Sequence, residues 1–161
     1  MNSHDFLDVK MMERALKLAE RGSYTTKPNP KVGAVICHDE NIIAEGWHRH
    51  AGQPHAEINA LKSAGDKAEG ATLYVNLEPC VHKGRTGPCV TALMDSGIRR
   101  VVIAMEDPNP DVAGKGIAAL RDAGIQLSIG IGFDQAKELN EGFIKRMLTG
   151  MPFVGLKMAA T

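Results

Sequence analysis

The sequence predicts a three-layer α/β/α fold built around a mixed five-stranded sheet, and three observations support that prediction. Short apolar runs typical of buried strands alternate with segments whose apolar residues recur at helical spacing. The first two strands are separated only by a polar turn at residues 39–41, so they are expected to pair as a hairpin. Helical segments separate the later strands, which favours parallel pairing with helices on both faces of the sheet.

The individual elements follow from local patterns along the chain. Residues 6–21 place apolar side chains at helical spacing between charges, and Gly22 ends this first helix. The hairpin covers residues 31–48, and the next helix covers residues 55–63 and ends at Gly65. The remaining elements are predicted as a strand at 71–77, a helix at 88–96, a strand at 100–105, a helix at 115–122, a strand at 125–129 and one or two helices at 134–148. The last three strands are expected to run parallel.

The composition is ordinary for a globular domain and excludes several classes of function. The 161 residues are 43% apolar and 24% charged, and residues 1–150 are expected to fold as one domain. Lysine and arginine balance aspartate and glutamate at 19 each, which argues against a non-specific nucleic-acid binder. No apolar run is long enough for a membrane span, no leader peptide is recognisable, and the odd number of cysteines favours a reducing, cytoplasmic location.

Three residues have the chemistry and spacing of a metal site. His55, Cys80 and Cys89 supply one nitrogen and two sulfur donors, a set that suits Zn²⁺. A catalytic zinc site uses three protein ligands and leaves the fourth position for water. His55 and Cys80 each follow a proline, and His55 and Cys89 are both expected to begin helices. Cys37 lies inside an apolar strand and is expected to be a small buried hydrophobic residue instead.

Glu57 is the candidate catalytic residue beside this metal site. It lies two positions after His55 on a helix and does not share its face, so its carboxylate is expected to lean over the open coordination position rather than to bind the metal. There it could accept a proton from metal-bound water and return it to a substrate nitrogen. A plainer interpretation is a solvated glutamate favoured by the helix N-terminus. The proximity of His55 favours the catalytic role.

The combination of these residues is typical of one enzyme class. An H-x-E motif followed by P-C and a further cysteine is characteristic of zinc deaminases that act on nucleobases. Here eight residues separate Cys80 from Cys89. With that spacing, and with TKPNPKVG at 26–33, GWHRHAGQPHAE at 46–57 and MEDPNPDVAGKG at 105–116, the chain resembles the deaminase domain of bacterial bifunctional riboflavin-biosynthesis deaminase/reductases, which have the cytidine-deaminase-like fold. The resemblance runs from about Met11 to the last residue.

The resemblance implies a reaction, a cofactor and a set of site residues. Family members hydrolyse the 2-amino group of 2,5-diamino-6-ribosylamino-4(3H)-pyrimidinone 5′-phosphate and release ammonia. Carried over by position, the Zn²⁺ ligands fall on His55, Cys80 and Cys89, and the proton shuttle falls on Glu57. The substrate-binding positions fall on Asn29, His48, His82, Arg85, Asp107 and Asn109.

The resemblance also implies partners. Residues 151–161 begin a new apolar, strand-like run and are expected to be the start of a truncated C-terminal reductase domain. The face that such a domain would normally cover is a natural surface for self-association, so a homo-oligomer is expected. The substrate is a small pyrimidine ribotide, and neither a nucleic acid nor a membrane is an expected partner.

Several alternatives stay open from the sequence. Asn29 between two prolines, and Asp107 and Asn109 in the DPNP segment, are also typical turn formers. Glu78 is expected to make local hydrogen bonds rather than to take part in chemistry. The chain could be another zinc deaminase that acts on a nucleotide or on a tRNA adenosine, although the cysteine spacing and the zero net charge weigh against tRNA. A non-catalytic structural zinc module would need a fourth ligand, for which His82 is the candidate.

Overall fold

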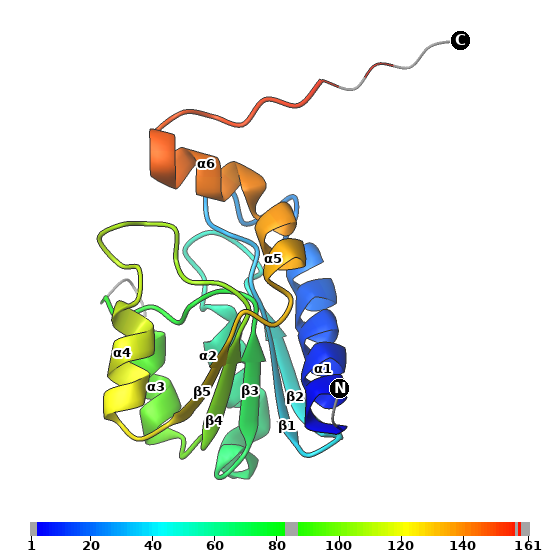
Figure 1. The fold of residues 1–161 in the computed structure, drawn as a ribbon, viewed down its shortest axis with the longest axis vertical. Helices are drawn as coiled ribbons and strands as arrows, with labels where there is room; N and C mark the ends of the chain where they lie inside the picture. Colours follow the sequence, from blue (N-terminus) through cyan, green and yellow to red (C-terminus); the bar gives the residue numbers. More distant parts are fainter. Residues whose placement is uncertain (1–2, 83–86, 157, 159–161) are drawn as a thin grey trace.

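The computed structural model describes residues 3–82, 87–156 and 158. Helices and strands follow one another in the predicted order, with one short 3₁₀ helix (η1) that the sequence did not predict (Figure 1). The elements are α1 (Ser3–Glu20), β1 (Gly33–His38), β2 (Asn41–Trp47), α2 (Ala56–Ala64), η1 (Gly65–Ala68), β3 (Thr72–Val75), α3 (Cys89–Asp95), β4 (Arg100–Ile103), α4 (Lys115–Asp122), β5 (Gln126–Ile129), α5 (Phe133–Leu139) and α6 (Glu141–Thr149).

The strands form one mixed sheet in the order β2-β1-β3-β4-β5. β1 pairs antiparallel with both β2 and β3, whereas β3, β4 and β5 run parallel. The hairpin turn lies between His38 and Asn41, which pair with each other, and it places Asp39 at a positive φ of 49°. The mixed five-stranded sheet, its opening hairpin and its parallel last strands are therefore confirmed.

Helices cover both faces of the sheet, so the three-layer prediction is also confirmed (Figure 1). Leu73 and Val75 of β3 belong to the core shared with α2, α3 and α4. Tyr74, between them, belongs to the opposite core shared with α1 and α5. The loops that follow β3 and β4 meet at the carboxyl end of the parallel strands, where ligands bind in open α/β sheets.

Helix α2 packs directly on β2 because Gly46 has no side chain. A Cβ at Gly46 would lie 2.3 Å from the backbone oxygen of Ala56 and 2.5 Å from the backbone nitrogen of Ala60. Apart from Glu57, the buried residues of α2 are all alanines, the third being Ala64. This close approach fixes the position of the first turn of α2 against the sheet.

Asparagine side chains decide where two elements end, because they replace regular backbone pairing there. β3 ends at Val75, and the side chain of Asn76 then accepts from the N–H of Gly33 (2.8 Å) and donates to the carbonyl of Lys31 (3.0 Å). The C-terminal segment, predicted as one or two helices, forms two that meet at Asn140, whose side chain bonds both the N–H and the C=O of Lys31 (2.8 and 2.9 Å). Two residues distant in sequence thus fix the segment that enters β1.

The tail does not form the expected strand. Residues 151–156 are neither helical nor extended in a sheet, and their side chains are exposed. A strand needs a neighbour for its backbone N–H and C=O groups, and no strand of the described chain pairs with this segment. The assignment of residues 151–161 to a second domain stays a prediction.

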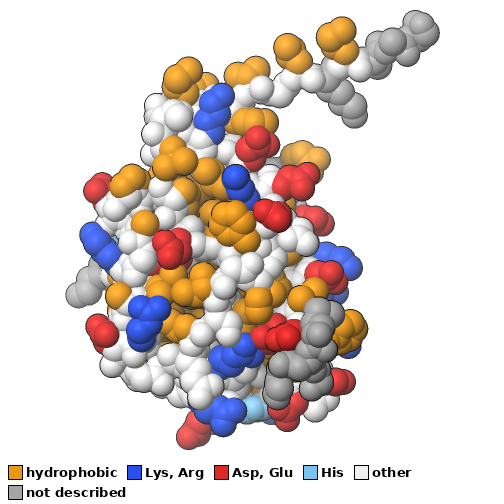
Figure 2. Space-filling model, viewed as in Figure 1, with side chains coloured by type: hydrophobic (Ala, Val, Ile, Leu, Met, Phe, Trp, Pro, Cys, Tyr) orange, Lys and Arg blue, Asp and Glu red, His pale blue; other side chains and the backbone are white. Residues whose placement is uncertain are grey.

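Charges of both signs are interspersed on the face shown in Figure 2, which agrees with the balanced composition. None of the described helices has the length and apolar character that a membrane crossing requires.

Candidate active site

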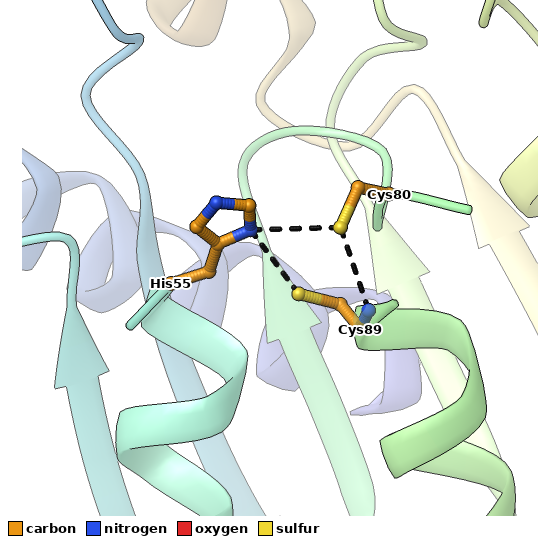
Figure 3. A group of neighbouring side chains, drawn as sticks. All are labelled: His55, Cys80 and Cys89. Atoms are coloured by element: carbon orange, nitrogen blue, oxygen red, sulfur yellow. Dashed lines mark hydrogen bonds between the residues drawn. The ribbon is translucent and has the colours of Figure 1, made fainter. Parts of the chain in front are cut away.

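The three predicted metal ligands converge from three different parts of the chain (Figure 3). His55 is the N-cap of α2, Cys80 lies in the loop after β3, and Cys89 is the first residue of α3. Nδ1 of His55 lies 3.5 Å from Sγ of Cys80 and 3.3 Å from Sγ of Cys89. The three donor atoms all lie within 4.8 Å of one another, so they can share one ion.

This donor set fits zinc. Zn–N bonds of about 2.0–2.1 Å and Zn–S bonds of about 2.3 Å at tetrahedral angles separate nitrogen from sulfur by about 3.6 Å. The two observed separations are 3.3 and 3.5 Å. Among the described histidine, cysteine, aspartate and glutamate residues, none is a fourth member of the group, and His82 lies outside it. The geometry is that of a three-ligand site with one open position rather than of a closed structural site.

The surroundings of Cys80 and Cys89 shift the pKa values of their two thiols in opposite directions. A hydrogen bond with the Cys89 thiol, together with the neighbouring His55 ring, lowers the pKa of Cys80. The same hydrogen bond and burial raise the pKa of Cys89. The backbone N–H of Cys89, at the start of α3, also donates to Sγ of Cys80 at 3.4 Å. Metal binding must displace the remaining thiol proton, because both cysteines ligate as thiolates.

Glu57 lies beside the ligands but is not one of them. Its side chain, in the first turn of α2, is 3% exposed and lines the same cavity as His55 and Cys80. Burial raises the pKa of the Glu57 carboxyl above its ordinary value. A buried carboxyl whose proton affinity is raised can both take up and release a proton during a reaction.

His48 and Asn29 form a hydrogen-bonded pair on the wall of this cavity. Nδ1 of His48 lies 3.2 Å from the carbonyl oxygen of Pro54, so it carries the proton, and burial lowers the pKa of this side chain. Nε2 of the neutral ring then accepts from Nδ2 of Asn29 at 3.2 Å. The His48 ring also meets His55 edge to face, with 5.5 Å between ring centroids. The pair therefore links the substrate-side wall to a metal ligand.

Asp107 and Asn109 follow β4 and enter the cavity from its other side. Oδ1 of Asp107 accepts from the N–H of Asn109 (2.9 Å), and Oδ1 of Asn109 accepts from the N–H of Asp111 (3.1 Å). Both residues are therefore turn formers and cavity-lining residues at once. Burial raises the pKa of Asp107.

One cavity of about 260 Å³ brings together most of the residues that the sequence singled out. Its lining includes Asn29, His48, His55, Glu57, Cys80, His82, Asp107 and Asn109. Cys89 is fully buried and is not part of this lining. Arg85 falls outside the described residues. Cys37 is buried away from this group, as expected, and burial raises its pKa to about 11. The placement agrees with the predicted roles, and the roles themselves stay predictions.

The sequence reasoning missed the apolar part of the cavity. Phe143 and Met147 on α6 line it, four positions apart and therefore on one helix face, together with Val32, Leu77 and Val112. In the sequence these residues have the pattern of an ordinary core, and only tertiary structure distinguishes a cavity wall from a filled core. Glu78 also lines the cavity, and its hydrogen bonds reach much further along the chain than expected.

Comparison with known proteins agrees with this geometry. Residues 7–105 match the family model of the cytidine and deoxycytidylate deaminase zinc-binding region. The riboflavin biosynthesis protein RibD of Escherichia coli (strain K12) is 56% identical over 96% of this chain. The diaminohydroxyphosphoribosylamino-pyrimidine deaminase of Buchnera aphidicola subsp. Schizaphis graminum (strain Sg) is 52% identical, over 88% of this chain and 96% of its own length. The chain belongs to this deaminase family.

Solved structures support the same conclusion for the fold. A structure of RibD from Acinetobacter baumannii superposes with a TM-score of 0.92 at 55% identity, over 94% of this chain and 43% of that one. The chain spans 42% of the length of the Escherichia coli relative. The cytidine-deaminase-like fold expected from the resemblance is therefore confirmed.

Proposed function

We propose that this chain is a zinc-dependent deaminase of riboflavin biosynthesis that hydrolyses the 2-amino group of 2,5-diamino-6-ribosylamino-4(3H)-pyrimidinone 5′-phosphate. The observation that carries the proposal is Glu57, a buried carboxyl that lines one cavity with His55 and Cys80, beside a group of three metal donors. A structural zinc module has no use for such a carboxyl. The names of the relatives, which the chain resembles over most of its length, point to the substrate.

The metal would be held by His55, Cys80 and Cys89. When bound, Zn²⁺ lowers the pKa of a coordinated water molecule, so that a nucleophile is available near neutral pH. The two thiolates and the neutral imidazole form the donor set, and α2 and α3 fix its geometry.

Glu57 would move the protons. Its carboxylate takes a proton from the attacking water and gives it to the ring nitrogen next to the carbon that bears the amino group. Glu57 next takes the remaining proton from the added hydroxyl group and hands it to the amine. The carbon–nitrogen bond to the amino group breaks, ammonia leaves, and the oxygen from water remains as a carbonyl. Burial of Glu57 suits this exchange because it raises the pKa of the carboxyl.

The cavity walls would orient the heterocycle. The side-chain amide of Asn29 uses its nitrogen Nδ2 for His48. Its oxygen Oδ1 has no hydrogen-bond partner within the described chain, so it can accept from an amino group of the substrate ring. Asp107 and Asn109 offer further polar contacts, and Phe143 offers an apolar face. Arg85 is expected to contact the 5′-phosphate, for which a guanidinium is well suited.

The partners belong to the same proposal. The relatives named RibD extend well beyond the region matched here, which supports a reductase domain after residue 150. The proposal also includes a homo-oligomeric state and a cytoplasmic location for the protein. Neither a nucleic acid nor a membrane is part of it.

The test is ammonia release from the diaminopyrimidinone ribotide by zinc-loaded protein, with Glu57→Gln beside it. General acid–base catalysis typically contributes about 10²- to 10⁴-fold, so we expect kcat to fall by that factor in the variant while zinc stays bound. Glu45→Gln is the matched control, because Glu45 is a surface carboxylate paired with Arg14 and does not line the cavity. No ammonia from folded, zinc-replete parent protein would contradict the substrate assignment, and cytosine nucleotides, adenine nucleotides and tRNA would then be screened.

A structural zinc module predicts a different result. In such a module His82→Ala would remove one nitrogen ligand from the metal. The absorption spectrum of a cobalt-substituted sample would report that loss. We expect no change in the spectrum of His82→Ala, because His82 lies outside the donor group.

A further inference from the structure

Glu78 makes an unusual set of hydrogen bonds beside the cavity. Its side chain is 4% exposed, and its two oxygens accept four backbone N–H groups. Oε2 accepts from Asp107 and Gly114, both at 3.0 Å. Oε1 accepts from Gly116 at 2.7 Å and from Ile117 at 3.1 Å. No lysine or arginine of the described chain forms an ion pair with it.

These four donors span both ends of one loop. Asp107 opens the segment that follows β4, and Gly114 caps α4 at its other end. The N–H groups of Gly116 and Ile117 lie in the first turn of α4, where backbone donors have no partner inside the helix. A carboxylate is the acceptor best suited to that position, because the helix dipole favours negative charge there. Glu78 therefore connects the two ends of this loop through hydrogen bonds.

The loop that Glu78 closes carries two cavity-lining residues. Asp107 donates its own N–H to Glu78, and Asn109 is bonded to the Asp107 side chain. The approach is close, since a Cβ at Gly116 would lie 2.1 Å from the carbonyl oxygen of Pro79. Glu78 also stands two positions before Cys80 in the chain. One side chain thus joins the turn that bears a metal ligand to the loop that bears the substrate contacts.

We propose that Glu78 is a positioning residue that holds Asp107 and Asn109 in register with the metal site. It does not touch the reacting atoms and exchanges no proton with the substrate. Its carboxylate sets the distance between the two halves of the cavity, so its loss displaces the substrate-binding wall while leaving the metal ligands in place. This inference rests on the proposed deaminase function for its kinetic test only.

The test variant is Glu78→Gln, which keeps the shape of the side chain. The amide oxygen can still accept two N–H groups, but the NH₂ group faces the other two donors and repels them. We expect KM for the diaminopyrimidinone ribotide to rise by about tenfold or more, since displaced positioning groups typically cost about 10- to 100-fold. We expect kcat to change by much less, and zinc content to equal that of the parent.

A matched control separates positioning from stability. Asp8→Asn alters another buried carboxylate, which is bonded to Arg100 and Tyr74 and does not line the cavity. If the effect of Glu78→Gln is only structural, both variants should lower the melting temperature and neither should change KM. That outcome would overturn the proposal.

A double-mutant cycle adds a sharper criterion. In an Asp107→Ala background, the further substitution Glu78→Gln should raise KM little, because both substitutions act on the same wall of the cavity.

A second readout needs no substrate. Amide hydrogen exchange measured by NMR should become faster at Asp107, Gly114 and Gly116 in Glu78→Gln, and should stay unchanged at Tyr74 in β3. If the parent shows no deaminase activity, the proposed function fails, yet the exchange data still decide whether Glu78 holds the loop. Unchanged exchange at these amides in a folded variant would refute the proposal.

The more conservative Glu78→Asp covers the case in which Glu78→Gln does not fold. Aspartate keeps the charge and loses one methylene, so we expect KM to rise less in Glu78→Asp than in Glu78→Gln. If neither variant folds with zinc bound, Glu78 serves folding as a whole and the positioning role is refuted.

Discussion

Two buried acidic side chains, Asp8 and Glu57, lie in one fold with opposite surroundings. Asp8 is 4% exposed and accepts from both terminal nitrogens of Arg100 (2.8 and 2.6 Å) and from the hydroxyl of Tyr74 (2.7 Å). Arg100 in turn donates to Ser128 at 2.8 Å. Glu57 is 3% exposed and has no lysine or arginine partner among the described ion pairs.

The difference shows how one scaffold separates structure from chemistry. Asp8 is held by fixed cationic and hydroxyl donors and does not line the cavity at the metal site, so its role is structural. Glu57 faces a cavity and a metal site, and burial raises the pKa of its carboxyl. Arg100, the partner of Asp8, begins β4, whereas several cavity-lining residues follow the ends of β3 and β4. Changes at one end should therefore alter stability, and changes at the other should alter catalysis.

Removal of a metal ligand should have the largest effect. We expect Cys89→Ala to lose zinc and to lower kcat/KM by about 10³-fold or more, because the metal supplies several kcal/mol of barrier lowering. Zinc analysis and ammonia release measure the two effects. Cys37→Ala is the matched control, since Cys37 is an equally buried cysteine outside the donor group. Zinc retained at full stoichiometry in Cys89→Ala would contradict the ligand assignment.

Loss of the Asp8 cluster should come next, and it should affect stability alone. Asp8→Ala leaves Arg100 without its carboxylate, and breaking a largely buried ion pair costs about 3 kcal/mol of unfolding free energy. Urea denaturation measures that loss, and KM measured below the unfolding transition should equal that of the parent. Glu45→Ala breaks the more exposed pair with Arg14 and should cost no more than about 1 kcal/mol. A raised KM in Asp8→Ala would show that the two ends are coupled.

A substitution in the cavity wall should have a moderate effect on substrate binding rather than on stability. Phe143→Ala removes the aromatic surface on α6, and stacking of a base on an aromatic side chain is worth about 1–3 kcal/mol, so we expect KM to rise by roughly tenfold. Steady-state kinetics on the ribotide provide the measurement. Phe6→Ala is the control, because Phe6 is 61% exposed on α1 and does not line the cavity. An equal KM for both variants would remove Phe143 from the binding surface.

The same contrast explains what the sequence could and could not predict. Periodicity predicted the element order and the mixed sheet, because each pattern reports burial within one element. Spacing and residue type predicted His55, Cys80 and Cys89, because the metal demands particular donor atoms, and Glu57, because its position after His55 suits a proton shuttle. The Asn140 break in the terminal helix and the four hydrogen bonds of Glu78 depend on partners distant along the chain.

Cavity-facing apolar residues were missed for a related reason. Phe143 and Met147 repeat at helical spacing like any core pair, and the sequence carries no sign that a cavity rather than a neighbouring side chain faces them. Local patterns encode that a residue is buried, whereas its partner is decided by topology.

Alkaline pH should destabilise the fold gradually through two buried groups on the α1 face of the sheet. Burial, with the Asp8 hydrogen bond, raises the pKa of Tyr74 above its ordinary value of 10.0, and burial raises that of Cys37 from 9.0 to about 11. A group whose folded-state pKa is raised stabilises the fold fully below its unfolded pKa and loses that contribution as pH rises, because the unfolded chain releases the proton first. The urea midpoint should therefore decline from about pH 9 upwards. Cys37→Ala should remove the part of the decline that begins near pH 9.0, the ordinary pKa of cysteine. Tyr74→Phe should remove the part that begins near pH 10.0, the ordinary pKa of tyrosine. An identical decline in the parent and both variants would place the alkaline sensitivity elsewhere in the chain.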